Sequence, residues 1–166
     1  RMMTATMAEE IESIKNISVI SDVDLVGEIW ENRPLMCCKP VWNLSLEYCG
    51  KTRAHKLGDI REEMKNKEVD VLVLTSLEET AWTLNLRGDD VECTPVFLSF
   101  MLITSLDATL YVQKASIQDE IVKELENDGI VVEDYFKIYD ALENTKNKKV
   151  WIDKNSANYN IVKKIK

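Results

Sequence analysis

The run of apolar residues at positions 69–74 constrains the fold more than any other stretch of this chain. It is short and rich in β-branched side chains, which is typical of a strand that is buried on both faces of its sheet. Further along, short apolar runs at residues 130–132 and 150–152 alternate with helical patterns, as they do in βαβ units. The order of the elements therefore predicts an α/β fold, with a mixed β-sheet that carries helices on both faces.

The middle of the chain is expected to form an antiparallel meander. Apolar runs at residues 69–74, 79–86 and 96–103 predict three strands. Their short connections leave no room for a crossover helix, so neighbouring strands should run in opposite directions. A fourth strand is expected at residues 109–112, after a turn at Asp107-Ala108.

Helices are predicted where apolar residues repeat every three or four positions and where a residue that caps helices precedes them. A short strand is expected at residues 16–21. Helices are expected at residues 7–15, after Ser21 or Asp22, after Thr52, between Ser116 and Gly129, at residues 135–142, and after Asn155 or Ser156.

The N-terminal part of the chain predicts a domain boundary near residue 34. Two of the three prolines, Pro34 and Pro40, lie close together here and indicate an extended linker. Residues 1–33 are therefore expected to be the remnant of a preceding domain with its linker, and residues 34–166 a domain of their own. The chain begins on an arginine and its last helical pattern has no stop signal, so we expect it to be part of a longer protein.

Composition limits the partners of the chain. The net charge is −8, with 29 acidic and 21 basic residues, so nucleic acid is not an expected partner. No run of about 18 apolar residues occurs, and a membrane is not expected either. The four cysteines form no Cys-x-x-Cys pair, which favours reduced thiols in a cytoplasmic protein.

The chain lacks the residues that independent catalysis would need. A hydrolytic metal site requires several convergent His, Asp or Glu ligands, but His55 is the one histidine, and we expect it at the surface near a helix start. The motifs of serine hydrolases, P-loop proteins and dinucleotide-binding proteins are absent. We expect neither a catalytic residue nor a metal ligand within these 166 residues.

An arginine before a glycine offers the best candidate for contact with a ligand. The guanidinium of Arg87 can bind a carboxylate through two hydrogen bonds, or it can form an ion pair within the domain with Asp89 or Asp90. The two aspartates are expected to stabilise the turn. If the preceding run is a strand, Asn85 shares the face of Arg87, whereas Trp82 lies on the other face and is expected in the core rather than facing a ligand.

Three groups of residues resemble one enzyme family, the Xaa-Pro aminopeptidases. Together they cover roughly residues 22–112, in the order and spacing of the family. The resemblance is carried by residues 24–30 with Arg33-Pro34, by residues 48–50 with Lys56-Leu57 and Ile60-Arg61, and by residues 81–91 with Pro95-Val96-Phe97.

The resemblance implies that the chain is a domain of the creatinase/prolidase N-terminal type, the second domain of the three-domain form, with a ribonuclease H-like fold. Its parent would remove the N-terminal residue of a peptide whose second residue is proline. Two Mn²⁺ ions would be held in a C-terminal pita-bread catalytic domain that is absent from this chain. Their ligands, two Asp, one His and two Glu, would lie beyond Lys166.

The resemblance also implies positions near the substrate. In this superfamily the corresponding loop commonly reaches a partner subunit's active site or the dimer interface, so the parent is expected to be a homodimer. Carried onto this sequence, Arg87 and Asn85 are the candidates for residues near the substrate or at the dimer interface, with Trp82 a third.

Some positions depart from the family pattern, and two other functions stay open. Thr83 stands where the family usually has an apolar residue, Glu78-Glu79 where it has two aspartates, and Cys93-Thr94 where it has Tyr-Asn. These departures concern substrate preference rather than fold.

One alternative is a protein-binding module from a pita-bread protein that has lost catalysis. The other, a small free-standing enzyme, has few candidate residues in this sequence.

Overall fold

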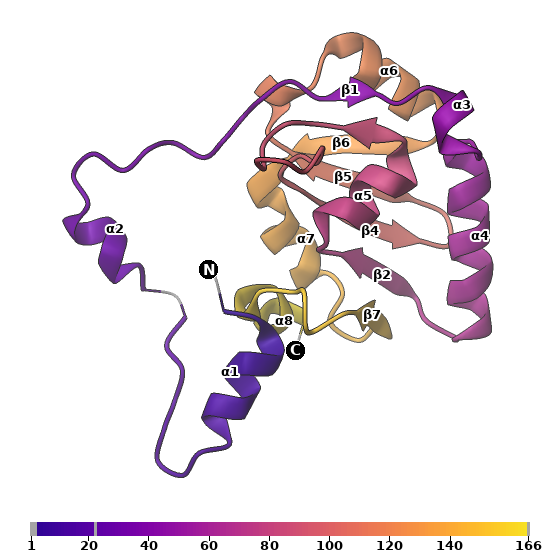
Figure 1. The fold of residues 1–166 in the computed structure, drawn as a ribbon. Coiled ribbons are helices and arrows are strands. Elements are labelled where there is room, and N and C mark those ends of the chain that lie inside the picture. The colour runs from indigo at the N-terminus through magenta and orange to yellow at the C-terminus, as the bar shows by residue number, and fades with distance from the viewer. Residues whose placement is uncertain (1–2, 22, 166) are drawn as a thin grey trace.

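A five-stranded mixed sheet forms the centre of the molecule (Figure 1). The computed structural model describes residues 3–21 and 23–165. The strands lie in the order β6-β5-β4-β2-β7, with β4 antiparallel to both β2 and β5, and the outer strands parallel to their neighbours. The predicted α/β mixed sheet is confirmed. The strands are β2 (Val71–Leu74), β4 (Ser99–Thr104), β5 (Ala108–Val112), β6 (Ile130–Asp134) and β7 (Val150–Ile152).

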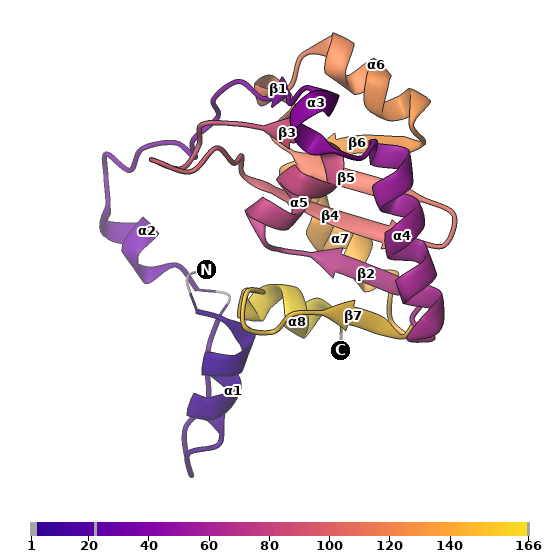
Figure 2. The same ribbon diagram turned by 45° about the vertical axis from the view of Figure 1, so that its right-hand side comes forward.

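Helices cover both faces of this sheet, as the buried run of β2 predicts. Side chains alternate along the strands, so that Leu72 and Met101 face one layer of helices while Val73 and Phe100 face the other. Figures 1 and 2 show α5 in front of the sheet and α7 behind it. The front layer contains α4 (Arg53–Asn66), α5 (Leu77–Leu84) and α6 (Asp119–Asn127), and the rear layer α7 (Ile138–Glu143) and α8 (Tyr159–Ile165).

The predicted strand at residues 79–86 is wrong, because this part of the chain forms helix α5. Ser76 caps the helix, with its hydroxyl accepting a hydrogen bond from the Glu79 N–H. Ala81 and Leu84 then lie three residues apart and are buried on one side of the helix. The antiparallel meander therefore consists of β2, β4 and β5, and α5 takes the place of the expected second strand, in the connection between β2 and β4.

A second sheet of two short strands lies over α5. Strands β1 (Trp42–Asn43) and β3 (Leu86–Arg87) pair antiparallel, with Trp42 opposite Arg87, and α3 (Leu46–Cys49) follows β1. Strands of two residues have too little pattern to be predicted from the sequence. Two 3-10 turns complete the domain, η1 (Lys114–Ser116) and η2 (Tyr135–Lys137).

Several predicted helix ends shift by a few residues. Thr52 caps α4 and Gly129, at a φ of +76°, follows α6, as predicted. Ser116 does not cap α6, because it lies in η1 and its hydroxyl donates to the Gln113 carbonyl. Helix α8 begins later than expected, and Asn158 replaces Asn155 or Ser156 at its start by accepting from the Ile161 N–H.

The N-terminal segment packs on the domain through its first helix, α1 (Ala5–Glu12), and is also bonded to α8 at Ser21. Ala5 N–H donates to the Ala157 carbonyl, and Tyr159 N–H donates to the Met3 carbonyl. No strand forms at residues 16–21, so that prediction is wrong; they pair with no other strand within the described residues. Helix α2 (Leu25–Ile29) is capped by Asp24 rather than Ser21, and Asp22 lies outside the described residues.

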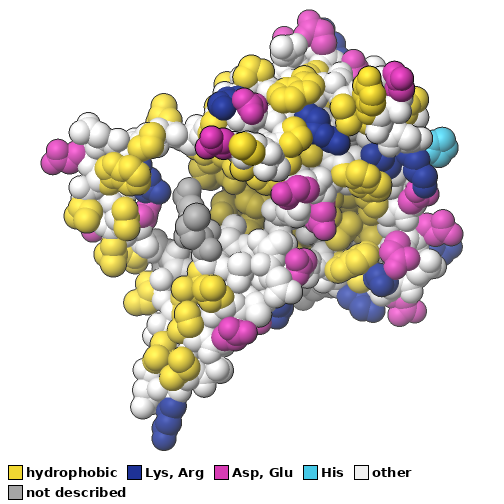
Figure 3. All heavy atoms as spheres, viewed as in Figure 1, with side chains coloured by type: hydrophobic (Ala, Val, Ile, Leu, Met, Phe, Trp, Pro, Cys, Tyr) yellow, Lys and Arg dark blue, Asp and Glu magenta, His cyan; other side chains and the backbone are white. Residues whose placement is uncertain are grey.

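Apolar side chains of this segment are exposed (Figure 3). They follow α1 and continue through α2, which lies away from the sheet in Figure 1. Among the residues that the structure describes, no helix has the length and apolar character needed to cross a membrane. The exposed side chains include Ile14, Ile17, Ile20, Val23, Leu25, Val26 and Ile29.

Candidate functional site at the end of helix α5

Asn85 ends helix α5 and turns the chain into β3. Its φ of +53° and ψ of +34° are left-handed, a conformation that asparagine tolerates better than most residues. The side chain is almost fully buried, and its amide is used inside the domain. Its Oδ1 accepts from Lys56 Nζ at 2.6 Å, and its Nδ2 donates to the Lys51 carbonyl at 2.9 Å. Asn85 therefore shapes the helix end from within.

Three cationic side chains donate hydrogen bonds to the backbone carbonyls at this end of α5. The last carbonyls of a helix have no partner within the helix and carry partial negative charge, so cations are favoured there. Two of the three cations, Arg53 and Lys56, come from α4, and Arg87 comes from β3. Lys56 Nζ donates to the Trp82 carbonyl at 2.7 Å, Arg53 Nε to the Leu84 carbonyl at 2.5 Å, and Arg87 Nη1 to the Ala81 carbonyl at 3.0 Å.

Lys56 is the most deeply buried of these cations, with 2% of its surface exposed. Its ammonium lies 4.2 Å from the centroid of the Trp82 ring, within the range of a cation–π interaction. No carboxylate of the described residues forms an ion pair with it. Burial lowers the pKa of Lys56, and the positive charges of Arg87 and Lys51 lower it further, while Cys49 acts in the opposite direction.

Sequence reasoning did not identify Lys56, although a signal for it exists. Lys56, Ile60 and Met64 are spaced four residues apart on α4, so they form one row along the helix. Ile60 and Met64 belong to the apolar core, which places the lysine at the end of an apolar row. A charged residue at such a position needs polar partners in the interior, and here the end of α5 supplies them.

Trp82 and Arg87 lie at the outer side of the same helix end. The expectation that Trp82 belongs to the core is wrong, because 49% of its surface is exposed. Arg87 is half-buried, and the predicted alternative of an ion pair with Asp89 or Asp90 does not form; it donates to the carbonyls of Ala81 and Leu86 instead. The structure thus brings Trp82, Asn85 and Arg87 together through a helix end rather than along a strand.

The two aspartates stabilise the turn that follows, as expected. Asp90 accepts hydrogen bonds from two backbone N–H groups, those of Lys39 at 2.9 Å and Leu98 at 2.8 Å. Asp89 forms an exposed ion pair with the Lys39 ammonium at 3.2 Å. The Asp90 carboxylate also raises the pKa of the Cys37 thiol. Asp90 therefore holds two backbone segments together, while Asp89 pairs with a side chain, and the two carboxylates do not converge on a ligand site.

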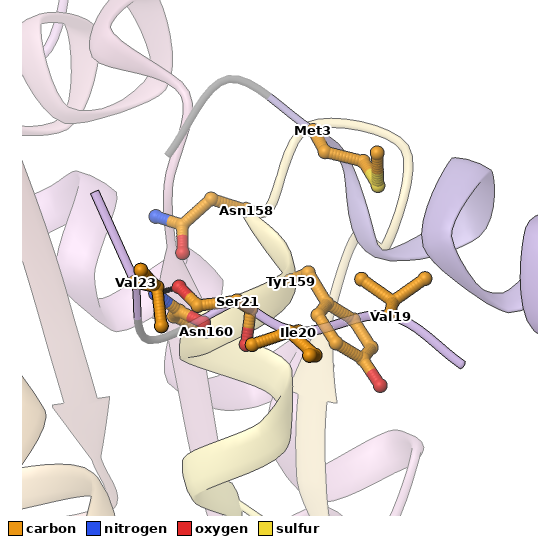
Figure 4. A pocket seen from close by; sticks show the side chains of 8 residues that line it. All are labelled: Met3, Val19, Ile20, Ser21, Val23, Asn158, Tyr159 and Asn160. Atoms are coloured by element: carbon orange, nitrogen blue, oxygen red, sulfur yellow. Dashed lines mark hydrogen bonds between the residues drawn. The ribbon is translucent and has the colours of Figure 1, made fainter. Parts of the chain in front are cut away.

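Metal-binding clusters do not provide a stronger candidate. Within residues 3–21 and 23–165, no group of three or more His, Cys, Asp or Glu side chains could hold a metal ion. His55 is exposed at the start of α4, where its Nδ1 lies 3.1 Å from the Thr52 hydroxyl. A pocket of about 160 Å³ lies between Val23 with residues 19–21 and the start of α8 (Figure 4). Asn160 bonds to the Ser21 carbonyl there, which fastens the segment to the helix.

A family profile for the creatinase/prolidase N-terminal domain matches residues 32–166. The chain belongs to this family. The curated relatives that it matches are named Xaa-Pro aminopeptidases, as the sequence resemblance predicted. It is 38% identical over 144 residues to a probable Xaa-Pro aminopeptidase P of Botryotinia fuckeliana, covering 83% of this chain and 22% of the relative. It is 30% identical to the Xaa-Pro aminopeptidase ApepP of Drosophila melanogaster, covering 90% of this chain and 25% of the relative.

The chain therefore spans about a quarter or less of the length of these relatives. A solved structure has the same fold: the X-prolyl aminopeptidase of Caenorhabditis elegans, described as a cytosolic enzyme with a di-nuclear active site. It superposes with a TM-score of 0.77 and 24% identity, over 84% of this chain and 24% of that one. The likeness supports the fold of the family, which was expected from the sequence.

Proposed function

We propose that this chain is a non-catalytic domain of a metal-dependent Xaa-Pro aminopeptidase, an enzyme that removes the N-terminal residue before a proline. One observation carries the proposal: the chain matches curated Xaa-Pro aminopeptidases over most of its own length but over about a quarter or less of theirs. The remaining length of such a protein leaves room for a catalytic domain. In that protein this domain acts beside a C-terminal pita-bread domain that binds two Mn²⁺ ions and the peptide.

Residues 34–166 form the creatinase-type domain in this proposal, and residues 1–33 are the end of a preceding domain with its linker. Two observations support the division. The family profile begins at residue 32, and the apolar side chains before it are exposed although they would normally be buried. The match to the Drosophila relative covers more of the chain than residues 32–166, so the similarity extends into the N-terminal segment. The parent is proposed to be a cytoplasmic homodimer.

The end of α5 is the part of the domain that we propose to lie near the substrate or at the dimer interface. Its exposed indole, Trp82, and its half-buried guanidinium, Arg87, supply the contact. Asn85 contributes indirectly, because it fixes the turn between Trp82 and Arg87. An indole and a guanidinium together suit a peptide, because one offers an apolar face and the other binds a carboxylate or carbonyl.

Substitution of Arg87 in the full-length protein tests this site. We expect Arg87→Ala to lower kcat/KM on an Xaa-Pro peptide by about tenfold, the equivalent of about 1.4 kcal/mol of transition-state binding. Arg53→Ala is the control, since it also removes a cation from a carbonyl of this helix end, but Arg53 is already paired with Glu124 and Asp128. A loss below about twofold for Arg87→Ala, in a protein whose Tm is unchanged, would rule out the substrate role.

The parent activity is tested separately. The full-length protein loaded with Mn²⁺ should release the first residue of an Xaa-Pro peptide, and the isolated chain should not. If a folded, metal-loaded protein releases nothing, the enzyme proposal fails and the protein-binding module becomes the better function.

A further inference from the structure

The ammonium of Lys56 lies between two groups that the proposed site uses. It is 2.6 Å from Asn85 Oδ1 and 4.2 Å from the centroid of the Trp82 ring, and it also bonds to the Trp82 carbonyl. Only 2% of the surface of Lys56 is exposed, whereas 49% of the surface of Trp82 faces solvent. The lysine therefore lies on the inner side of the indole and leaves the outer part of the ring open.

We propose that Lys56 is a positioning residue, which fixes the indole of Trp82 and the left-handed turn at Asn85 so that the outer side of α5 is presented in one orientation. This inference rests on the proposed function of that helix end. An exposed tryptophan can adopt several rotamers, and a cation beneath its ring favours the one in which the ring covers the charge. The bond to Asn85 acts on the same element, because that residue sets the direction in which the chain continues toward Arg87.

The surroundings of Lys56 favour this role over simple stabilisation. A buried ammonium is costly unless it is well bonded, and its hydrogen bonds here go to a carbonyl and an amide oxygen, both weaker partners than a carboxylate. A methionine or leucine at this place would continue the apolar row of Ile60 and Met64 without that cost. Both hydrogen bonds and the ring contact converge on residues 82 and 85, at the end of one helix.

The first test reads the position of the indole without using activity. In this chain labelled with 5-fluorotryptophan, Lys56→Met should shift and broaden the ¹⁹F resonance of Trp82, assigned through Trp82→Phe. The resonance of Trp30, which lies outside this region, should stay in place. Lys67→Met is the matched control, because Lys67 lies 5.1 Å from the Trp151 ring centroid and should move only that resonance. An unchanged Trp82 resonance in Lys56→Met overturns the proposal.

A second measurement covers the case in which Lys56→Met fails to fold. If the indole covers Lys56, Trp82→Ala should increase the rate at which an amine-acylating reagent modifies Lys56 by at least about tenfold, measured by mass spectrometry of peptides. Lys67, exposed in the unmodified chain, supplies the reference rate. An unchanged rate at Lys56 would show that the ring does not cover it.

The activity of the full-length protein then distinguishes a positioning role of Lys56 from a purely structural one. Lys56→Met should lower kcat/KM at least about fivefold, and Lys56→Arg, which keeps the charge, should recover part of the loss. In a Trp82→Leu background the same substitution should lower kcat/KM by a clearly smaller factor, because the contact with the indole is gone and only the bond to Asn85 is left to lose. An equal loss in both backgrounds contradicts the proposal. If the unmodified protein has no peptidase activity, only the proposed function fails, since the spectroscopic and labelling tests are independent of it.

Discussion

The segment between residues 81 and 95 has two ends that use charge in opposite ways. At the helical end, residues 81–87, one buried and two half-buried cations donate to backbone carbonyls of α5. At the turn end, residues 88–95, carboxylates accept from backbone N–H groups or pair with an exposed lysine. The comparison teaches that most charges of this distinctive segment stabilise its own backbone. The groups that remain open to a partner, above all the Trp82 indole, are the ones that this scaffold holds in place.

The junction between the two ends is where a single methyl group should have the largest effect. Gly88 is buried, and a Cβ built there would lie 2.6 Å from the Phe97 Cβ and 3.1 Å from the Val96 carbonyl oxygen. Because the backbone of residues 96–97 would have to move, we expect Gly88→Ala to lower the free energy of unfolding by about 3 kcal/mol. Denaturant unfolding followed by circular dichroism measures this.

Gly58 provides the control for that substitution. It lies inside α4, and a Cβ there would meet nothing within 4 Å. Gly58→Ala should therefore increase stability by about 1 kcal/mol, through the helix propensity of alanine alone. If both alanines had the same effect, the close approach of Gly88 to Phe97 would not be what joins the two ends.

At the turn end, the two neighbouring aspartates should differ in their contribution to stability. Asp90 is half-buried and receives two backbone N–H groups from segments far apart in the chain, so Asp90→Ala should lower the free energy of unfolding by about 1.5 kcal/mol. Urea titration at neutral pH gives the value. Equal losses at positions 89 and 90 would mean that the turn is held by general negative charge and not by these particular bonds.

Asp89→Ala is the matched control and the smallest effect. Its ion pair with Lys39 is exposed on both sides, so the loss should be below about 0.5 kcal/mol and should decrease further as salt is added.

Much of the architecture could be predicted from the sequence, because strong periodicity survives in it. The apolar run of β2, the helix of α6 and the alternation that ends in β7 all follow from residue patterns. Helix α5 was mistaken for a strand because its threonines, tryptophan and leucines suit either structure. The Ser76 and Glu79 pair, a capping signal three residues apart, was the feature that could have decided between them.

The candidate site was only partly predictable. Trp82, Asn85 and Arg87 could be selected from the segment itself, but their arrangement could not, since it depends on whether they follow a strand or end a helix. Lys56 and Arg53 come from another helix, and the contacts that they make with α5 depend on how α4 and α5 pack. Local sequence patterns do not determine how two helices pack. Cations that donate hydrogen bonds to a neighbouring helix are therefore hard to recognise from the sequence.

The arrangement of strands also has a consequence for the order in which the molecule assembles and opens. Strands β4 and β5 are joined by a tight turn, in which Thr104 and Asp107 are hydrogen-bonded, whereas β7 must find β2 across much of the chain, pairing Val150 with Val71. Loop-closure entropy makes the first pairing easy and the second slow. We therefore expect β7 to join late and to open first, taking α8 and the attached α1 with it. Faster hydrogen exchange in β7 than in β4 would be its signature. Helices α1 and α8 would then unfold together with β7 as one cooperative unit. A substitution that destabilises α1 would therefore increase the opening of the sheet at the β7 edge.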